Sequence, residues 1–390
     1  MENNKPTFGK QVFTFFHKLT GIKSFKSIVS SFACIGVGLL LGYILMLCLD
    51  VNHAGAGIGT LLTYGFSSKA NFSRVLYQAT PMMLTGLAIA FSFQLGLFNI
   101  GVTGQLTAGA FVSIIMAISG CNWFLCLLTA GIVGAIVGFI PGILKAKFNV
   151  NEVLSGIMLN WIVYYIIGII GQTSLSSKFK DKTVPSNLVT VPEGSRIPEV
   201  NWFGFKGVTV AIFIAIAILI LFQVILHYTK FGFELKLSGS NKDAAKYAGI
   251  NQTKNIILSM VFAGFFAGLA GFIIYATGSN IKNFRWDAGN NTLISDGFNG
   301  ISVSLIAQNS PIGCFFAAIF LALIDVAQTP LKGISDAYNI HYTELIKSII
   351  IYAASISSFI IMILEKFHSR NANNKNLLDW SKHRKAKEVK

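Results

Sequence analysis

Two short segments of the sequence place asparagine side chains inside strongly apolar surroundings. The first runs Leu97-Phe98-Asn99-Ile100-Gly101-Val102-Thr103-Gly104-Gln105, and the second runs Gly297-Phe298-Asn299-Gly300-Ile301-Ser302. Burying an amide in hydrocarbon without a hydrogen-bond partner costs about 2 to 7 kcal/mol. Because both halves of the chain place amides in such surroundings, we expect these residues to line a shared polar pathway through a membrane.

The residue types in the first segment suit such a pathway. Asn99 and Gln105 each offer donors and acceptors to a polar solute, and Gly101 lets the backbone turn or be approached closely. This combination is typical of an interrupted helix that faces a polar solute. The alternative is that the amides bond to neighbouring backbone carbonyls and only fix the packing of helices.

A third amide, Asn160, lies within an apolar run and is followed one helical turn later by Tyr164 and Tyr165. A passing solute ring could stack or form a hydrogen bond there. A hydrogen bond between helices, beside an aromatic packing patch, is the open alternative. The residues that we expect to border the pathway are Phe98, Asn99, Gly101, Gln105, Asn160, Phe298, Asn299 and Gly300.

Membrane-spanning helices are the elements that must position these residues. The 390 residues are 53% hydrophobic and only 12% charged, against about 25% charged in an ordinary soluble domain. A helix needs about 20 apolar residues to cross roughly 30 Å of hydrocarbon. The candidate spans are 28–48, 76–95, 104–119, 123–144, 153–172, 207–226, 254–277, 293–309, 312–330 and 344–365. The sequence therefore predicts an all-α membrane protein of about ten transmembrane helices.

The order of the spans suggests an internal repeat. Each half, about 28–172 and 207–366, has one leading span and then four more, with a Phe-Asn segment early in the later group. Five is an odd number, so the halves would enter the bilayer from opposite faces, as in the inverted repeats of many transporters. Spans 104–119 and 293–309 are short and interrupted by glycine, so broken or re-entrant helices are expected there.

Basic residues indicate which parts lie in the cytoplasm. The formal net charge of +15 comes largely from the two ends and the connecting loops. Beside spanning helices, such charge indicates cytoplasmic retention rather than nucleic-acid binding. We therefore expect a cytoplasmic N-terminal segment 1–27, a transmembrane domain 28–366, a cytoplasmic segment 227–252 within it and a cytoplasmic tail 367–390. The external loop 173–206 could cap the pathway, contact a partner or simply be solvated.

The segment 227–252 contains a short helix that is too polar to span. Asn241 is expected to cap its start, Asp243 suits its positive N-terminus, and Gly249 supplies a stop. Such a helix could dock in a groove of another protein or lie on lipid headgroups. The residues expected to make that contact are Gly239, Asn241, Ala244, Ala245, Tyr247 and Gly249.

Two spans carry glycines at intervals of three or four residues, which places small side chains along one face of each helix. These glycines are Gly131, Gly134, Gly138, Gly142, Gly264, Gly268 and Gly271. Small residues at this spacing let helices approach closely. We interpret both sets as packing seams rather than functional sites.

Missing motifs narrow the possible functions. The sequence has no phosphate-binding loop and no paired-histidine metal site, so any ATP that drives transport must bind to another chain. An ion-coupled secondary transporter of a small polar solute remains an alternative, although it would usually place a carboxylate near the midplane. An intramembrane enzyme would need a converging nucleophile and base, and none is legible.

Over roughly residues 76 to 365, the chain resembles the permease subunits of bacterial ABC importers for nucleosides and simple sugars, the ribose/galactoside-type branch. Its most specific pieces are 97–105, 151–153, 157–160, 239–250 and 297–313. The form Phe-Asn-Ile-Gly-x-x-Gly-Gln looks most like the nucleoside-importing members. The chain departs from the family pattern at Thr103, where an acidic residue is frequent, and at Ser240, where a bulkier residue is common.

The resemblance implies a transport subunit, not an enzyme, in the bacterial cell membrane with both termini cytoplasmic. It implies a second permease subunit, commonly a different chain, and an external, often lipid-anchored, solute-binding protein. It also implies an ATPase with two nucleotide-binding domains, which would hold ATP and Mg²⁺, so no cofactor is expected in this chain. The residues 239–249 would then transmit closure of the ATPase to the spans.

Overall fold

The computed structural model describes most of the chain. The described residues are 23–172, 188–200, 208–277, 283–285, 293–294, 296–335, 338, 344–345, 348–349 and 351–353. The chain divides into one compact unit of Met1–Ile44 with Ile346–Lys390, and a second unit of Leu45–Leu345. Helix α2 (Lys23–Leu49) begins in the first unit and ends in the second. The expected basic tail 367–390 and most of the segment 1–27 lie outside the described residues.

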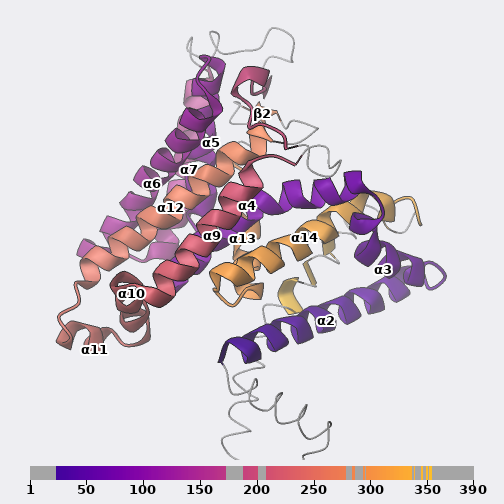
Figure 1. Ribbon diagram of the computed structural model, residues 1–390, viewed down its shortest axis with the longest axis horizontal. Coiled ribbons are helices and arrows are strands. Elements are labelled where there is room, and N and C mark those ends of the chain that lie inside the picture. Colours follow the sequence, from indigo (N-terminus) through magenta and orange to yellow (C-terminus); the bar gives the residue numbers. More distant parts are fainter. Residues whose placement is uncertain are drawn as a thin grey trace, which may run out of the picture. The chain divides into compact units, whose positions relative to one another are not determined.

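Long apolar helices dominate the described residues (Figure 1). Six of them are long and apolar enough to cross a membrane, judged by length and composition. They are α4 (Lys69–Phe93), α6 (Trp123–Phe148), α7 (Glu152–Gln172), α9 (Ala211–Tyr228), α12 (Gln252–Ala276) and α14 (Pro311–Leu331). Helix α5 (Val102–Ile118) and the Ile35–Leu49 part of α2 are shorter apolar helices. The chain is therefore an all-α, multi-pass membrane protein, as predicted.

Several short elements join these helices. They are α3 (Ala54–Thr63), the 3-10 turns η1 (Tyr64–Phe66) and η2 (Glu193–Ser195), α10 (Lys230–Ser240), α11 (Lys242–Tyr247), α13 (Asp296–Ile306), and the antiparallel strands β1 (Leu188–Val189) and β2 (Phe284–Arg285). At 1.5 Å per residue, the 11 residues of α13 extend only about 17 Å, too little to cross the hydrocarbon. This agrees with the expectation of a broken or re-entrant helix within 293–309.

Helices α6 and α12 lie side by side along their lengths in the second unit (Figure 1). Their contact runs through the predicted glycines. A Cβ atom on Gly264 would overlap the Gly134 carbonyl oxygen, and one on Gly268 would overlap the Ala130 carbonyl oxygen. The two backbones touch directly, so any larger side chain there would force the helices apart. The interpretation of these glycines as packing seams is confirmed.

Aromatic side chains hold α4 and α9 against α12. The rings of Phe222 on α9 and Phe266 on α12 pack edge to face with centroids 4.5 Å apart. Phe91 on α4 meets Phe222 in the same geometry at 5.2 Å. Edge-to-face pairs favour one relative placement of their helices. This cluster therefore fixes α9, which leads directly into α10.

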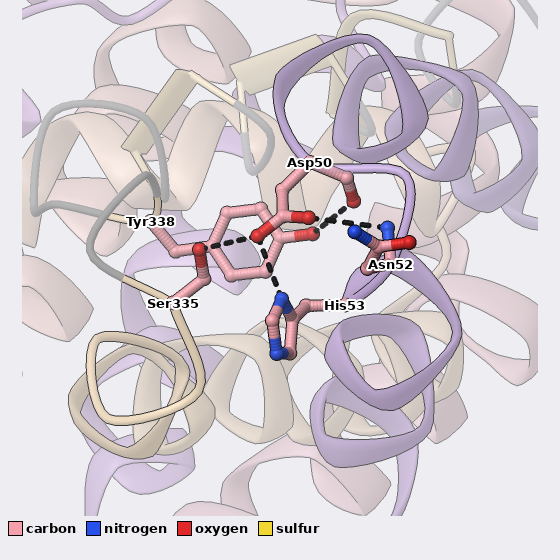
Figure 2. A network of polar contacts seen from close by, with 5 residues as sticks. All are labelled: Asp50, Asn52, His53, Ser335 and Tyr338. Atoms are coloured by element: carbon pink, nitrogen blue, oxygen red, sulfur yellow. Dashed lines mark hydrogen bonds and ion pairs between the residues drawn. The ribbon is translucent and has the colours of Figure 1, made fainter.

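A polar network joins the turn after α2 to the residues that follow α14 (Figure 2). Asp50 Oδ2 accepts hydrogen bonds from Ser335 Oγ at 2.6 Å and from His53 Nδ1 at 2.7 Å. The Asp50 carbonyl oxygen accepts a third from Tyr338 Oη at 3.4 Å. The bonds from Ser335 and His53 lower the pKa of Asp50 below its ordinary value of 3.8. A lowered carboxyl pKa favours the folded state at neutral pH, and that contribution is lost only in acid.

Candidate translocation site

The first Phe-Asn segment begins in a bend after α4. Gly96 adopts a left-handed conformation with φ of 70°, and the Leu97 N–H donates to the Ser92 carbonyl at 3.2 Å. This is the Schellman pattern, in which glycine avoids the steric penalty of a left-handed Cβ. The bend takes the chain out of α4 and carries Phe98 and Asn99 to the start of α5.

Asn99 and Gln105 form a reciprocal amide pair within the protein. Asn99 Nδ2 donates to Gln105 Oε1 at 3.1 Å, and Gln105 Nε2 donates to Asn99 Oδ1 at 3.4 Å. Both side chains are 0% exposed. In this arrangement the two amides bond to each other and are closed off from solvent.

Asn160 caps α5 from a neighbouring helix. The residue before α5, Gly101, has no side chain with which to cap it. Instead, Asn160 Oδ1 on α7 accepts from the Gly104 N–H at 2.8 Å, and its Nδ2 donates to the Ile100 carbonyl at 3.1 Å. Glycine is required at 104 because a Cβ there would lie 2.6 Å from Asn160 Oδ1. The amide therefore forms the bond that was the alternative to a pathway role, and its position sets where α5 begins.

The second Phe-Asn segment packs directly on the first. A Cβ added at Gly297 on α13 would lie 2.6 Å from the Thr103 Cα, so the two backbones are in contact. One turn later, a Cβ on Gly300 would lie 2.7 Å from the Thr85 carbonyl carbon on α4. Small residues thus seat α13 against both α4 and α5. Segments from opposite halves of the chain meet at one place, although nothing in either segment alone reveals the pairing.

The two asparagines nevertheless have different environments. Asn99 lies in a loop and is fully buried, whereas Asn299 lies in the first turn of α13 and is half-buried. Asn299 Nδ2 donates to Asp296 Oδ1 at a long 3.5 Å. The neighbouring Phe298 side chain is 45% exposed. The second segment is therefore the more accessible of the two.

Thr103 lies in the first segment, where Gly297 of the second packs on it, and its hydroxyl has no hydrogen-bond partner among the described residues. Its side chain is 0% exposed, and its Oγ1 has no hydrogen-bond partner there. A buried polar group in this state costs about 1 to 3 kcal/mol. The sequence marked Thr103 only as a departure from a family pattern, and its burial follows from the contact with Gly297.

The aromatic residues beside Asn160 point to a different face of α7. Trp161 is 48% exposed and Tyr165 is 58% exposed, whereas Asn160 is buried. The ring centroids of Trp161 and Tyr164 are 5.6 Å apart, and those of Tyr164 and Tyr165 are 5.2 Å apart. The structure therefore separates the predicted amide from Tyr165, which lies on the outer face of α7, whereas Tyr164 is half-buried.

The expected short polar helix is α11. Asn241 Oδ1 accepts from the Ala244 N–H at 3.0 Å, which is the predicted N-cap. Gly249, with φ of 74°, ends the helix, and the Ile250 N–H donates to the Ala245 carbonyl at 3.0 Å. Helix α10, which the sequence did not predict, precedes it and packs against α9. Both predicted caps are confirmed.

Exposure divides the six expected contact residues of this segment. Tyr247 is 94% exposed and Ala244 is also exposed, so both can meet another molecule. Ala245 is 0% exposed and faces inward. Gly239 abuts the backbone of Gln94. The expectation that Ala245 contributes to a contact surface is therefore revised, because Ala245 is the residue of α11 that packs inward while the rest of the helix is exposed.

Residues 71–355 match the family described as branched-chain amino acid transport system / permease component. The chain belongs to this permease family. It is 31% identical to the guanosine ABC transporter permease protein NupP of Bacillus subtilis (strain 168), over 90% of this chain and 100% of that protein. It is 33% identical to the nucleoside ABC transporter permease protein NupB of Lactococcus lactis subsp. cremoris (strain MG1363), over 84% and 91%.

A second permease of Bacillus subtilis (strain 168), the guanosine ABC transporter permease protein NupQ, is 26% identical over 67% of this chain and 85% of that protein. No solved structure matches the chain. Membership of the permease family makes this chain a membrane transport component, in agreement with the resemblance found in its motifs.

Proposed function

We propose that this chain is one of two permease subunits of an ATP-driven importer of nucleosides or related simple sugars, and that it provides part of the translocation pathway. The observation that carries the proposal is the packing of Gly297 on Thr103, which brings the two Phe-Asn segments together. The similarity to NupP and NupB over most of the chain supports a nucleoside as the cargo.

The chemistry of the segments suits transient contact with such a cargo. A nucleoside presents ribose hydroxyls and ring donors and acceptors, which side-chain amides can match from either side. In the resting arrangement, Asn99 and Gln105 satisfy each other. A solute that displaces one of these bonds replaces it with another of similar strength, so little net affinity results. Weak binding lets the pathway release its cargo.

Basic residues support a cytoplasmic location for α10 and α11. Lys145 at the end of α6 forms an ion pair with Glu152 at 2.9 Å, and Lys242 of α11 also attracts Glu152 electrostatically. The α6–α7 turn and α11 thus share one lysine-rich end, which the positive-inside rule assigns to the cytoplasm. Both chain termini would then lie on that side as well.

Three partners complete the proposed importer. The exposed face of α11 would dock an ATPase with two nucleotide-binding domains, on which ATP and Mg²⁺ would bind. NupP and NupQ are two permeases of one bacterium, which supports a second, different permease subunit. A solute-binding lipoprotein would deliver cargo at the opposite end. The exposed apolar faces of α6 and α7 are suited to lipid or to the second permease.

Changing Asn99 or Asn299 to alanine is expected to lower nucleoside uptake while the complex still assembles. The expected fall is about five- to tenfold for each, as for the loss of one hydrogen bond worth about 1 to 1.5 kcal/mol. Uptake of radiolabelled nucleoside into proteoliposomes measures the effect. Asn299→Ala is the cleaner variant, because Asn99→Ala also leaves Gln105 without its buried partner.

The matched control is Ile136→Ala on the outer face of α6, where the side chain is 60% exposed and lies outside both Phe-Asn segments. It should leave uptake near the unsubstituted level. Normal uptake by both asparagine variants would contradict the pathway assignment. Uptake that depends on a proton or sodium gradient, by the purified chain alone, would contradict ATP-driven import.

Replacing Tyr247 with alanine is expected to weaken association with the ATPase without unfolding the spans. An exposed aromatic on a capped helix is suited to be a binding hot spot, for which truncation costs about 2 kcal/mol or more, a factor of about 30 in affinity. Ala244→Arg should act in the same direction, because it places bulk on the same exposed helix. Co-purification of the ATPase measures both effects.

Tyr228→Ala is the control for this experiment. Tyr228 is 85% exposed at the end of α9, so this substitution removes the same aromatic ring at a site outside α11. It should retain the ATPase. If Tyr247→Ala and Ala244→Arg also retain it at the unsubstituted level, α11 is not the docking helix.

A further inference from the structure

We infer that Gln94 is the positioning residue through which movement of α10 and α11 reaches both Phe-Asn segments. The inference rests on the proposed function, in which α11 receives motion from an ATPase. It concerns a residue that was not among the expected pathway or docking residues. Two tertiary contacts of Gln94 and its place in the chain just before the first segment carry it.

The first contact joins Gln94 to α10 through the backbone. A Cβ on Gly239 would overlap the Gln94 carbonyl oxygen, and it would lie 3.1 Å from the Leu95 Cα. No side chain separates the two backbones at this point. Packed protein interiors have low compressibility, so a displacement of α10 toward this contact must move Gln94 as well.

The second contact joins Gln94 to the turn between α13 and α14. Gln94 Nε2 donates to the Asn309 carbonyl oxygen at 2.9 Å. That turn is itself held to α13, because Ser304 Oγ donates to Asn309 Oδ1 at 2.8 Å and the Asn309 N–H donates to the Ser304 carbonyl at 2.9 Å. Movement of Gln94 therefore pulls on the C-terminal end of the helix that carries Phe298 and Asn299.

The third connection is along the chain. Gln94 lies five residues before Asn99, and the bend at Gly96 is fixed by the hydrogen bond from Leu97 to Ser92. A shift of Gln94 thus reaches the buried amide pair through a short, ordered loop. One residue contacts α10, holds the turn after α13 and leads directly into the first segment.

Reconstituted complexes of the full chain with its ATPase and second permease test this inference. Gln94→Met keeps the length of the side chain but removes the donor to Asn309. We expect the variant to assemble and to hydrolyse ATP, while the number of ATP molecules hydrolysed per nucleoside imported rises at least about fivefold, the lower end of the usual range for coupled sites. A residue with only a structural role would not change that ratio.

Two further variants make the test specific. Ser304→Ala removes the side-chain bond that holds Asn309 at the other end of the link, so it should raise the same ratio even if Gln94→Met does not fold. Gln328→Met on α14 is the control, because Gln328 is half-buried and, within the described part of the chain, its amide donates to Asp325 in its own helix at 3.3 Å. It should leave the ratio unchanged.

The possible failures are distinguishable. An unsubstituted complex that hydrolyses ATP but imports no nucleoside would overturn the proposed function and the inference together. A coupled unsubstituted complex in which Gln94→Met and Ser304→Ala keep the normal ratio would overturn the inference alone. A rise in the ratio for both variants, and not for Gln328→Met, would support it.

Discussion

Replacing Gly264 with leucine is expected to prevent the chain from accumulating as a folded membrane protein. Even one carbon atom at this position would overlap the Gly134 carbonyl oxygen and lie 3.1 Å from the Gly138 Cα. These are backbone atoms, so no side chain can turn aside to make room. Overpacking a core typically lowers the free energy of unfolding by about 1 to 3 kcal/mol. Because the overlap here is with backbone atoms, we expect a loss at the upper end of that range or beyond it.

The effect should extend beyond α6 and α12. Helix α12 also packs against α4 and α5, so separation of α6 from α12 disturbs the helices that carry the first Phe-Asn segment. Gly264→Ala should show a smaller loss in the same direction, since it adds one carbon instead of four. The amount of folded protein in detergent, measured by size-exclusion chromatography after membrane extraction, is the appropriate readout.

Gly59 provides the matched control for this substitution. It is also a helical glycine, in α3, but a Cβ there would meet nothing within 4 Å. Gly59→Leu should therefore leave the yield of folded protein near that of the unsubstituted chain. If Gly264→Leu gave the same yield and thermal stability as Gly59→Leu, the close approach of α6 and α12 would be refuted.

The second large effect is expected for Asn160→Leu, which keeps the number and branching of the side-chain heavy atoms but removes both polar groups. The Gly104 N–H and the Ile100 carbonyl would then lose their partner, at a cost of about 1 to 3 kcal/mol for each buried group. The start of α5 would no longer be fixed. Nucleoside uptake should fall by more than about tenfold, the factor that corresponds to 1.4 kcal/mol.

Ile162→Ala is the control on the same helix, because Ile162 is 51% exposed and faces away from α5. It should preserve uptake and the temperature at which the purified complex unfolds. For Asn160→Leu, both quantities are expected to fall together, since the amide supports the structure at the start of α5. Unchanged uptake in that variant would exclude a role for the α5 cap in transport.

The sequence predicted those features that depend on neighbouring residues in the chain. The run of apolar residues located the long spans, because each must cover the hydrocarbon by its own length. Asn241 and Gly249 indicated the two ends of α11, because capping involves atoms only a few residues apart. The spacing of glycines along α6 and α12 indicated a packing face for the same reason.

The sequence did not predict which elements meet. Gln94 carried no visible signal, and its role follows from contacts with Gly239 and Asn309 that lie far away in the chain. The network around Asp50 likewise depends on Ser335 and Tyr338. The burial of Ala245 also could not be inferred, because the sequence of a short helix does not indicate which of its residues pack against neighbouring elements.

What the sequence determined by itself is therefore a multi-pass helical membrane chain with amides in its spans, glycine-lined helix faces and a capped polar helix. Only the tertiary structure decided that Asn99 pairs with Gln105, that Asn160 caps α5, and that Gly297 brings α13 onto Thr103. The physical reason is that apolar length and helix caps are local properties. The partner of a buried amide is chosen by the packing of the whole bundle.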